Sequence, residues 1–169
     1  MRRIALALSI ALALSGVAAA EFVAQEKDFR CLLDGRAVAG KHFFFVFHRR
    51  HRKLRKALRI AERNLPARRY PAGTIIQLFP FEAMVKRGGR FNPEGDGWEL
   101  FRLSVTPAGT RILARGGAEV ANFAGSCQGC HAAARGYDLV CEGHAVAALG
   151  LSEETIRTLQ HDPRCPSAP

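Results

Sequence analysis

The stretch SCQGCHAAARGYDLVC, residues 126–141, contains the feature that most constrains this chain. Cys127, Cys130 and His131 form a complete C-x-x-C-H motif, which is the pattern that attaches haem covalently. The spacing fits the chemistry, because two thiols must reach two neighbouring vinyl groups of one porphyrin. The residue that follows then lies under the ring, where an imidazole can bind iron. The sequence therefore predicts one covalent haem c, with His131 as an iron ligand.

Two other uses of these cysteines compete with haem. A zinc ion would take Cys127, Cys130, Cys141 and His144 in a tetrahedral site. That choice leaves His131 without a purpose. A redox-active pair would place the C-x-x-C at a helix start directly after a strand. Residues 122–126 are expected instead to form a loop, so we favour haem over both alternatives.

The first twenty residues have the three parts of a secretory signal peptide. Arg2 and Arg3 supply the positive charge, residues 4–14 are apolar apart from Ser9, and residues 18–20 are alanines. The apolar run is too short to span a bilayer. We therefore expect residues 1–20 to be removed and residues 21–169 to form a single exported, soluble domain, periplasmic in a bacterium. An oxidising compartment allows disulfides, but five cysteines cannot all pair with one another.

The remaining pattern predicts an α+β fold with an antiparallel sheet, flanking helices and a haem site near the C-terminus. An apolar stripe predicts a helix over residues 49–65 that ends at Pro66, and Ser152 is placed to cap a second, short helix. Strands are expected at residues 74–79, 98–105 and 110–114, the last two joined by a four-residue loop, 106–109. Residues 43–47 are dense in phenylalanine, which predicts burial on more than one side or a pocket wall.

Cys141 and Cys165 are expected to pair across the last helix, although Cys31–Cys141 and Cys31–Cys165 pairs remain open. The helix over residues 49–65 is crowded with arginine and lysine, and the whole chain carries a net charge of +10. In an exported protein such a surface predicts docking to an acidic redox partner or an anionic membrane surface, not nucleic acid.

The late position of the haem motif, behind a run of strands, resembles the cytochrome P460 and cytochrome c′-β family. The matching pieces are Tyr70-Pro71-Ala72-Gly73-Thr74, Gly97-Trp98-Glu99-Leu100-Phe101, and Cys127 to His131 followed by Tyr137-Asp138-Leu139-Val140. The resemblance implies a largely antiparallel sheet, His131 as proximal ligand and an open distal site. Family members bind nitric oxide or oxidise hydroxylamine, and the oxidising members cross-link a lysine to the porphyrin. Residues 73–81 contain no lysine, and Lys86 is expected to be solvated, so no catalytic residue is assigned.

The predicted function is therefore a mono-haem protein that binds or redox-processes a small ligand such as nitric oxide or hydroxylamine. The alternative is an electron-transfer cytochrome in which Met84 fills the sixth position, because a histidine and methionine pair raises the potential of haem iron. A core position is the competing interpretation of Met84. The other histidines lack a supporting motif. A zinc-binding module is the third hypothesis.

Overall fold

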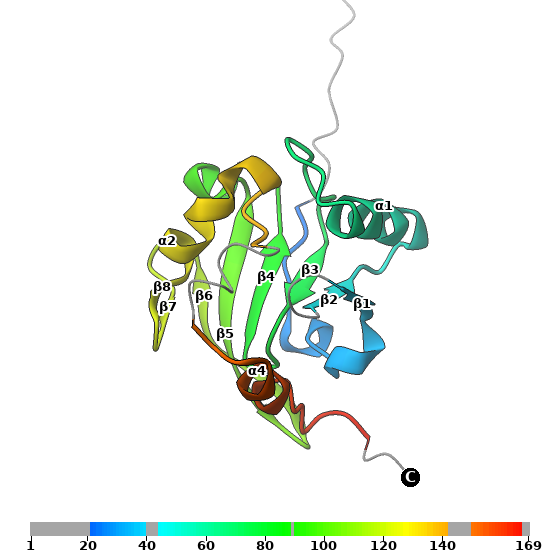
Figure 1. The fold of residues 1–169 in the computed structure, drawn as a ribbon, viewed down its shortest axis with the longest axis vertical. Coiled ribbons are helices and arrows are strands. Elements are labelled where there is room, and N and C mark those ends of the chain that lie inside the picture. Colours follow the sequence, from blue (N-terminus) through cyan, green and yellow to red (C-terminus); the bar gives the residue numbers. More distant parts are fainter. Residues whose placement is uncertain (1–20, 40–43, 89, 142–149, 167–169) are drawn as a thin grey trace, which may run out of the picture.

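The computed structural model describes residues 21–39, 44–88, 90–141 and 150–166. It contains one six-stranded antiparallel sheet in which every strand pairs with its sequence neighbours, in the order β1-β2-β3-β4-β5-β6 (Figure 1). The strands are β1 (Arg36–Val38), β2 (Phe44–Phe47), β3 (Ile75–Gln77), β4 (Glu82–Lys86), β5 (Trp98–Thr106) and β6 (Gly109–Gly116). The predicted α+β class with an antiparallel sheet is confirmed.

Short helices and a second, two-stranded sheet complete the described chain. The helices are η1 (Glu26–Asp28), η2 (Leu32–Asp34), α1 (His51–Glu62), η3 (Pro93–Gly95), α2 (Cys127–His131), η4 (Ala132–Tyr137) and α4 (Glu153–Leu159), and the small sheet pairs β7 (Ala121–Asn122) with β8 (Gly125–Ser126). Within the described ranges, every helix is too short or too polar to cross a bilayer. The proposed signal peptide, residues 1–20, lies outside the described residues.

The large sheet buries both faces, and strand alternation divides its side chains between two clusters. One cluster joins Met84, Trp98 and Leu100 to apolar residues of α1 and to Leu139 and Val140. The other joins the opposite faces of the same strands to the N-terminal segment, including Phe29 and Leu32. The first face therefore carries both α1 and the chain around the C-x-x-C-H motif.

The phenylalanine-rich segment is β2, and its described residues are buried on both faces as the sequence predicted. Phe44 and Val46 belong to the face that carries the motif, whereas Phe45 and Phe47 belong to the opposite face. Residue 43 lies outside the described residues. If these rings line a pocket on the motif side, Phe44 can contribute to it, whereas Phe45 and Phe47 cannot.

Several element boundaries differ from the sequence prediction: the strand expected over residues 74–79 is shortened to β3, the strand expected over 110–114 is lengthened to β6, and α1 and the β5–β6 hairpin also differ. Helix α1 ends at Glu62, four residues before Pro66, and Asn64 takes a left-handed backbone conformation with φ 44°. The hairpin between β5 and β6 is also tighter than expected, because Thr106 pairs with Gly109 and leaves a two-residue connection, Pro107-Ala108. The predicted C-terminal helix is confirmed, with the Ser152 hydroxyl accepting a hydrogen bond from the Thr155 amide at 3.1 Å.

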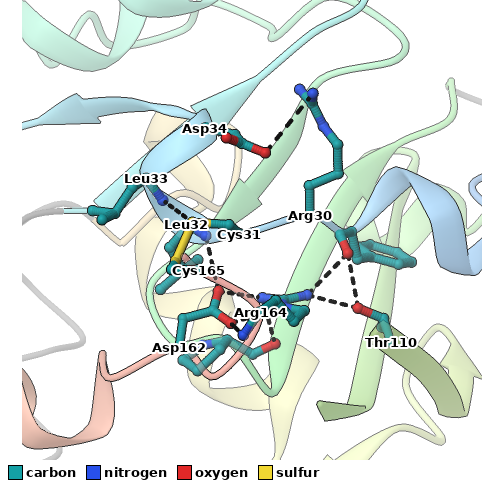
Figure 2. Close-up of a disulfide and its surroundings, with 11 residues drawn as sticks. Arg30, Cys31, Leu32, Leu33, Asp34, Thr110, Asp162, Arg164 and Cys165 are labelled. Atoms are coloured by element: carbon teal, nitrogen blue, oxygen red, sulfur yellow. Dashed lines mark hydrogen bonds and ion pairs between the residues drawn. A yellow bond between two sulfur atoms is a disulfide. The ribbon is translucent and has the colours of Figure 1, made fainter. Parts of the chain in front are cut away.

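The disulfide joins Cys31 to Cys165, so the predicted Cys141–Cys165 pair is wrong. The bond ties η2 to the segment after α4 across 134 positions of sequence. A neighbouring polar contact joins the same segments, as Figure 2 shows, because the Leu32 amide donates to Asp162 at 2.8 Å. Arg164 also ties the segment after α4 to β6 by donating to Thr110 at 2.8 Å. The pairing follows from this tertiary contact, which no local spacing encodes.

Replacing both Cys31 and Cys165 by alanine should lower the free energy of unfolding by roughly 2–5 kcal/mol, because the closed loop is long and its constraint acts on the unfolded chain. Denaturant titration measures the change, and Cys141→Ala serves as the control, since Cys141 is a free cysteine. Peptide mapping without reduction should recover linked peptides that contain Cys31 and Cys165. A linked Cys141–Cys165 peptide would contradict the structure.

Candidate haem-attachment site

The C-x-x-C-H motif forms helix α2, directly after the β7–β8 hairpin. The Ser126 hydroxyl caps the helix by accepting from the Gly129 amide at 3.1 Å, and the Cys127 amide donates to the Val120 carbonyl at 3.1 Å. Residues three and four positions apart share one side of a helix, so Cys127, Cys130 and His131 lie on a common face. The helix thus brings together all three residues that the sequence selected.

Both motif cysteines are free thiols. Cys130 is exposed, whereas Cys127 is partly buried and packs against the core cluster on the motif side. Burial raises the pKa of the Cys127 thiol, with a further contribution from the nearby Glu82 carboxylate. The expectation of a loop before the motif is wrong, because a short strand precedes a helix start here. The raised pKa of Cys127 is nevertheless the opposite of what an active thiol–disulfide pair requires.

His131 makes one short hydrogen bond, between its Nδ1 atom and the Leu139 carbonyl oxygen at 2.7 Å. A carbonyl can only accept, so Nδ1 must carry the proton and donate it. The neutral ring then keeps a free lone pair on Nε2. Burial lowers the pKa of His131 below its usual value, against an opposing effect of the Leu139 bond, and this favours the neutral ring. The site therefore presents an imidazole in the tautomer that binds a metal through Nε2.

Cys141 lies beside this histidine, with its Sγ atom 3.4 Å from His131 Nδ1. Burial, followed by the proximity of Cys130, raises the pKa of the Cys141 thiol to about 12. Zinc needs thiolates, and burial raises the cost of forming them at both Cys127 and Cys141. His144, the fourth ligand of the zinc hypothesis, lies outside the described residues.

A group of potential metal ligands in the described part of the chain consists of Cys31, Asp162 and Cys165. Its two cysteines form the disulfide, which removes their thiolate donors. Asp162 accepts hydrogen bonds from the Leu32 amide at 2.8 Å and from Arg164 Nε at 2.8 Å. We therefore assign this group to structure and not to metal binding.

Lys86 is the largest departure from the sequence prediction. It is 4% exposed, not solvated, and its ammonium group lies 2.5 Å from the Asp138 carboxylate and 2.6 Å from the Asp96 carbonyl oxygen. Its Nζ atom is also 4.9 Å from the centre of the Trp98 ring. Burial lowers the pKa of Lys86 and raises that of Asp138, while their mutual contact opposes both shifts.

Sequence reasoning missed this pair because it assigned no strand to residues 82–86. Strand β4 alternates, so Lys86 points to the same side as Met84. Recognising Glu82-Ala83-Met84-Val85-Lys86 as a strand would have placed the lysine on a buried face. Its partner Asp138 lies 52 positions away, so no local pattern indicates the pairing.

The other residues that the sequence suggested as iron ligands are packed in the core, hydrogen-bonded to a carbonyl, exposed or outside the described residues. Met84 is 4% exposed and belongs to the apolar cluster on the motif side, which agrees with a core position. His48 is held by the Ala72 carbonyl oxygen at 3.1 Å, and His51 and His161 are exposed. His42 lies outside the described residues.

A cavity of about 530 Å³ borders the buried lysine. It is lined by Arg69, Tyr70, Ala72, Lys86, Gly88, Pro93 and Asp96. None of the three motif residues lines it, so we do not assign the haem to this cavity. Arg69, at the edge of this cavity, contacts two carboxylates. Its guanidinium lies 2.6 Å from that of Asp96 and 3.4 Å from that of Asp138.

Comparison with known proteins gives no match to this chain among protein-family models, curated proteins or solved structures.

Proposed function

We propose that this chain is an exported c-type protein that carries one haem on Cys127, Cys130 and His131. The observation that supports the proposal best is the tautomer of His131. The Leu139 carbonyl accepts from Nδ1 at 2.7 Å, which leaves the Nε2 lone pair free for iron. The same short helix carries two free thiols, Cys127 and Cys130, three positions apart as the haem-attachment motif requires. The donor set present in the fold therefore fits haem c.

The bound haem would supply an iron centre for ligand binding and one-electron chemistry. The chain's own residues hold and orient that centre. Cys127 and Cys130 would form the two thioether links, and His131 would bind the metal on one side. A hydrogen bond from Nδ1 to a carbonyl makes an imidazole a stronger electron donor, so the Leu139 contact would also adjust the affinity for iron and its potential.

Replacing Cys127 and Cys130 together by alanine should abolish covalent haem, because both thioether links are removed. Haem staining of a denaturing gel and a pyridine haemochrome spectrum measure the loss in protein exported to the periplasm. The matched control is Cys141→Ala, which removes the neighbouring thiol 3.4 Å from His131 and should leave haem attached. Haem that persisted in the double variant would refute the attachment site.

We further propose that the sixth iron position is open and takes a small ligand such as nitric oxide or hydroxylamine. Met84 agrees with this proposal, because it is 4% exposed in an apolar cluster with Trp98 and Leu139 and so has a packing role that needs no iron. The resemblance to the cytochrome P460 and cytochrome c′-β family implies the same open site.

The ferrous protein should be high-spin and its spectrum should shift promptly with carbon monoxide. Met84→Leu, which keeps an apolar side chain of similar volume in the core, should leave both spectra unchanged. The opposite result would be a low-spin ferrous spectrum that carbon monoxide does not alter, converted to a high-spin one by Met84→Leu. That result would establish the electron-transfer alternative with a histidine and methionine pair.

The basic surface of α1 is proposed to dock on an anionic membrane surface. Arg52, Arg55, Lys56 and Arg59 are exposed on this helix. No carboxylate of the described chain lies within salt-bridge distance of these four side chains. Among the described residues, therefore, no carboxylate pairs with these charges, and they are exposed to an external partner. An acidic protein is the other partner that this charge would suit.

The position of α1 favours the membrane over a redox partner. Helix α1 packs near β1 and β2, at one end of the sheet, whereas α2 follows the strands at the other end (Figure 1). A protein that exchanges electrons with haem gains from docking close to the motif. Binding to a membrane does not depend on closeness to the motif. It needs only electrostatic attraction, which contributes about 1 kcal/mol for each basic residue near the lipid headgroups.

The mature protein should bind vesicles that contain phosphatidylglycerol at low salt, and release them at physiological salt because ions screen the attraction. Changing Arg52, Arg55 and Arg59 to glutamine should weaken binding by about two orders of magnitude, at about 1 kcal/mol for each charge. The matched control changes Arg111, Arg135 and Arg157, which are exposed elsewhere, and removes the same net charge. Equal loss in both variants, or binding that does not respond to salt, would exclude docking through α1.

A further inference from the structure

The hydrogen-bond acceptor of His131 lies in an unusual turn. Asp138 and Leu139 both adopt left-handed backbone conformations, with φ 57° and 62°. A branched side chain rarely takes this conformation, which costs free energy unless surrounding contacts impose it. The turn directs the Leu139 carbonyl to His131 Nδ1 at 2.7 Å. Something outside the turn must therefore hold it.

The contacts that hold the turn converge on Asp138, which is 4% exposed. Its Oδ2 atom accepts from the Tyr70 amide at 2.7 Å, and its Oδ1 atom accepts from Lys86 Nζ at 2.5 Å. Its backbone carbonyl accepts from Trp98 Nε1 at 2.7 Å. These three donors come from different parts of the fold, and two of them, Lys86 and Trp98, belong to the central strands β4 and β5.

The Lys86–Asp138 ion pair is not explained by its contribution to the free energy of unfolding alone. Desolvating two charges opposes their attraction, and apolar residues of the same size often serve a core equally well. Here the charged pair does something that apolar residues cannot do. It fixes both the position and the rotation of Asp138, and Leu139 follows directly in the chain.

We propose that Lys86 and Asp138 are positioning residues for His131. Acting through the Leu139 carbonyl, they keep the proton on Nδ1 and the lone pair on Nε2. The arrangement links the rigid sheet to the imidazole through Lys86, Asp138 and Leu139. Its consequence for iron rests on the proposed function, whereas its consequence for the histidine tautomer does not.

The first measurement is made on the full mature chain without haem, labelled with ¹⁵N in histidine. The His131 signal, identified by its loss in His131→Gln, should report a proton on Nδ1 alone. In Lys86→Met the turn loses the ammonium contact and keeps those of Tyr70 and Trp98, and the signal should shift toward the average of two exchanging tautomers. Asp138→Asn keeps the size of the side chain and should produce a shift in the same direction, so it replaces Lys86→Met if that variant does not fold.

The matched control is Arg164→Met. Arg164 and Asp162 form a second buried ion pair. Their side chains are 5% and 1% exposed, which are also the side-chain values for Lys86 and Asp138. The contacts of Arg164 are with Phe29, Pro80, Thr110 and Asp162, away from the motif. It should lower thermal stability but leave the His131 signal unchanged. A shift of equal size in this control, or no shift in a folded Lys86→Met, would overturn the proposal.

The second measurement uses the haem-loaded protein. Lys86→Met should lower the iron–histidine stretching frequency and raise the reduction potential, because a weaker Nδ1 hydrogen bond makes the imidazole a poorer donor. Arg164→Met should change neither. If the wild-type chain attached no haem, the proposed function would fail, while the tautomer measurement would still decide whether Lys86 and Asp138 position His131.

Discussion

The buried carboxylate of Asp138 imposes a constraint on which much of the motif side depends. A charge removed from water must be paired and fully hydrogen-bonded, or folding loses several kcal/mol. Asp138 meets this requirement with Lys86 at 2.5 Å and the Tyr70 amide at 2.7 Å. The sheet, the segment before β3 and the chain after the motif must therefore come together in one arrangement. Removing the lysine alone would leave this buried charge with only the largely exposed Arg69, 3.4 Å away, as a cationic partner, and should cost up to about 3–5 kcal/mol.

The antiparallel sheet makes this arrangement possible because it buries both of its faces. The N-terminal segment covers one face, where Phe29 packs on Phe101 with ring centres 4.9 Å apart. Helix α1 and the chain around the motif share the other. The Cys31–Cys165 disulfide closes this structure by joining the N-terminal segment to the end of the described chain. The disulfide uses neither motif cysteine, so Cys127 and Cys130 remain free thiols.

The proposed site combines an exposed thiol, which suits covalent attachment, with a histidine held in one orientation, which suits metal binding. Cys130 is exposed, which leaves a thiol open to a porphyrin and to the proteins that attach it. His131 is held by a carbonyl at 2.7 Å, and its ring is kept neutral by burial. A ligand whose orientation is set before the metal arrives loses less conformational entropy on binding. The basic helix α1 lies at the other end of the sheet, so docking there would leave the motif uncovered (Figure 1).

The sequence by itself determined the features that depend on local chemistry. It located Cys127, Cys130 and His131, the stripe of α1, the Ser152 cap and the alternation of β5, because spacing along a helix or strand decides which side chains share a face. It also predicted the antiparallel α+β class. The proposed cofactor follows from that local motif, and the proposed export follows from residues 1–20, which lie outside the described structure.

Tertiary structure alone decided the pairings between distant residues. Cys31 meets Cys165, and Lys86 meets Asp138, across 134 and 52 positions of sequence. Lys86 in isolation has the character of a surface residue, and Cys165 has a closer candidate in Cys141. Both expectations fail, because a contact between distant residues depends on how whole elements pack and not on the residues next to each partner in the sequence. The acceptor for His131 depends on the same packing, since the Leu139 carbonyl is directed by a turn that the sheet holds in place.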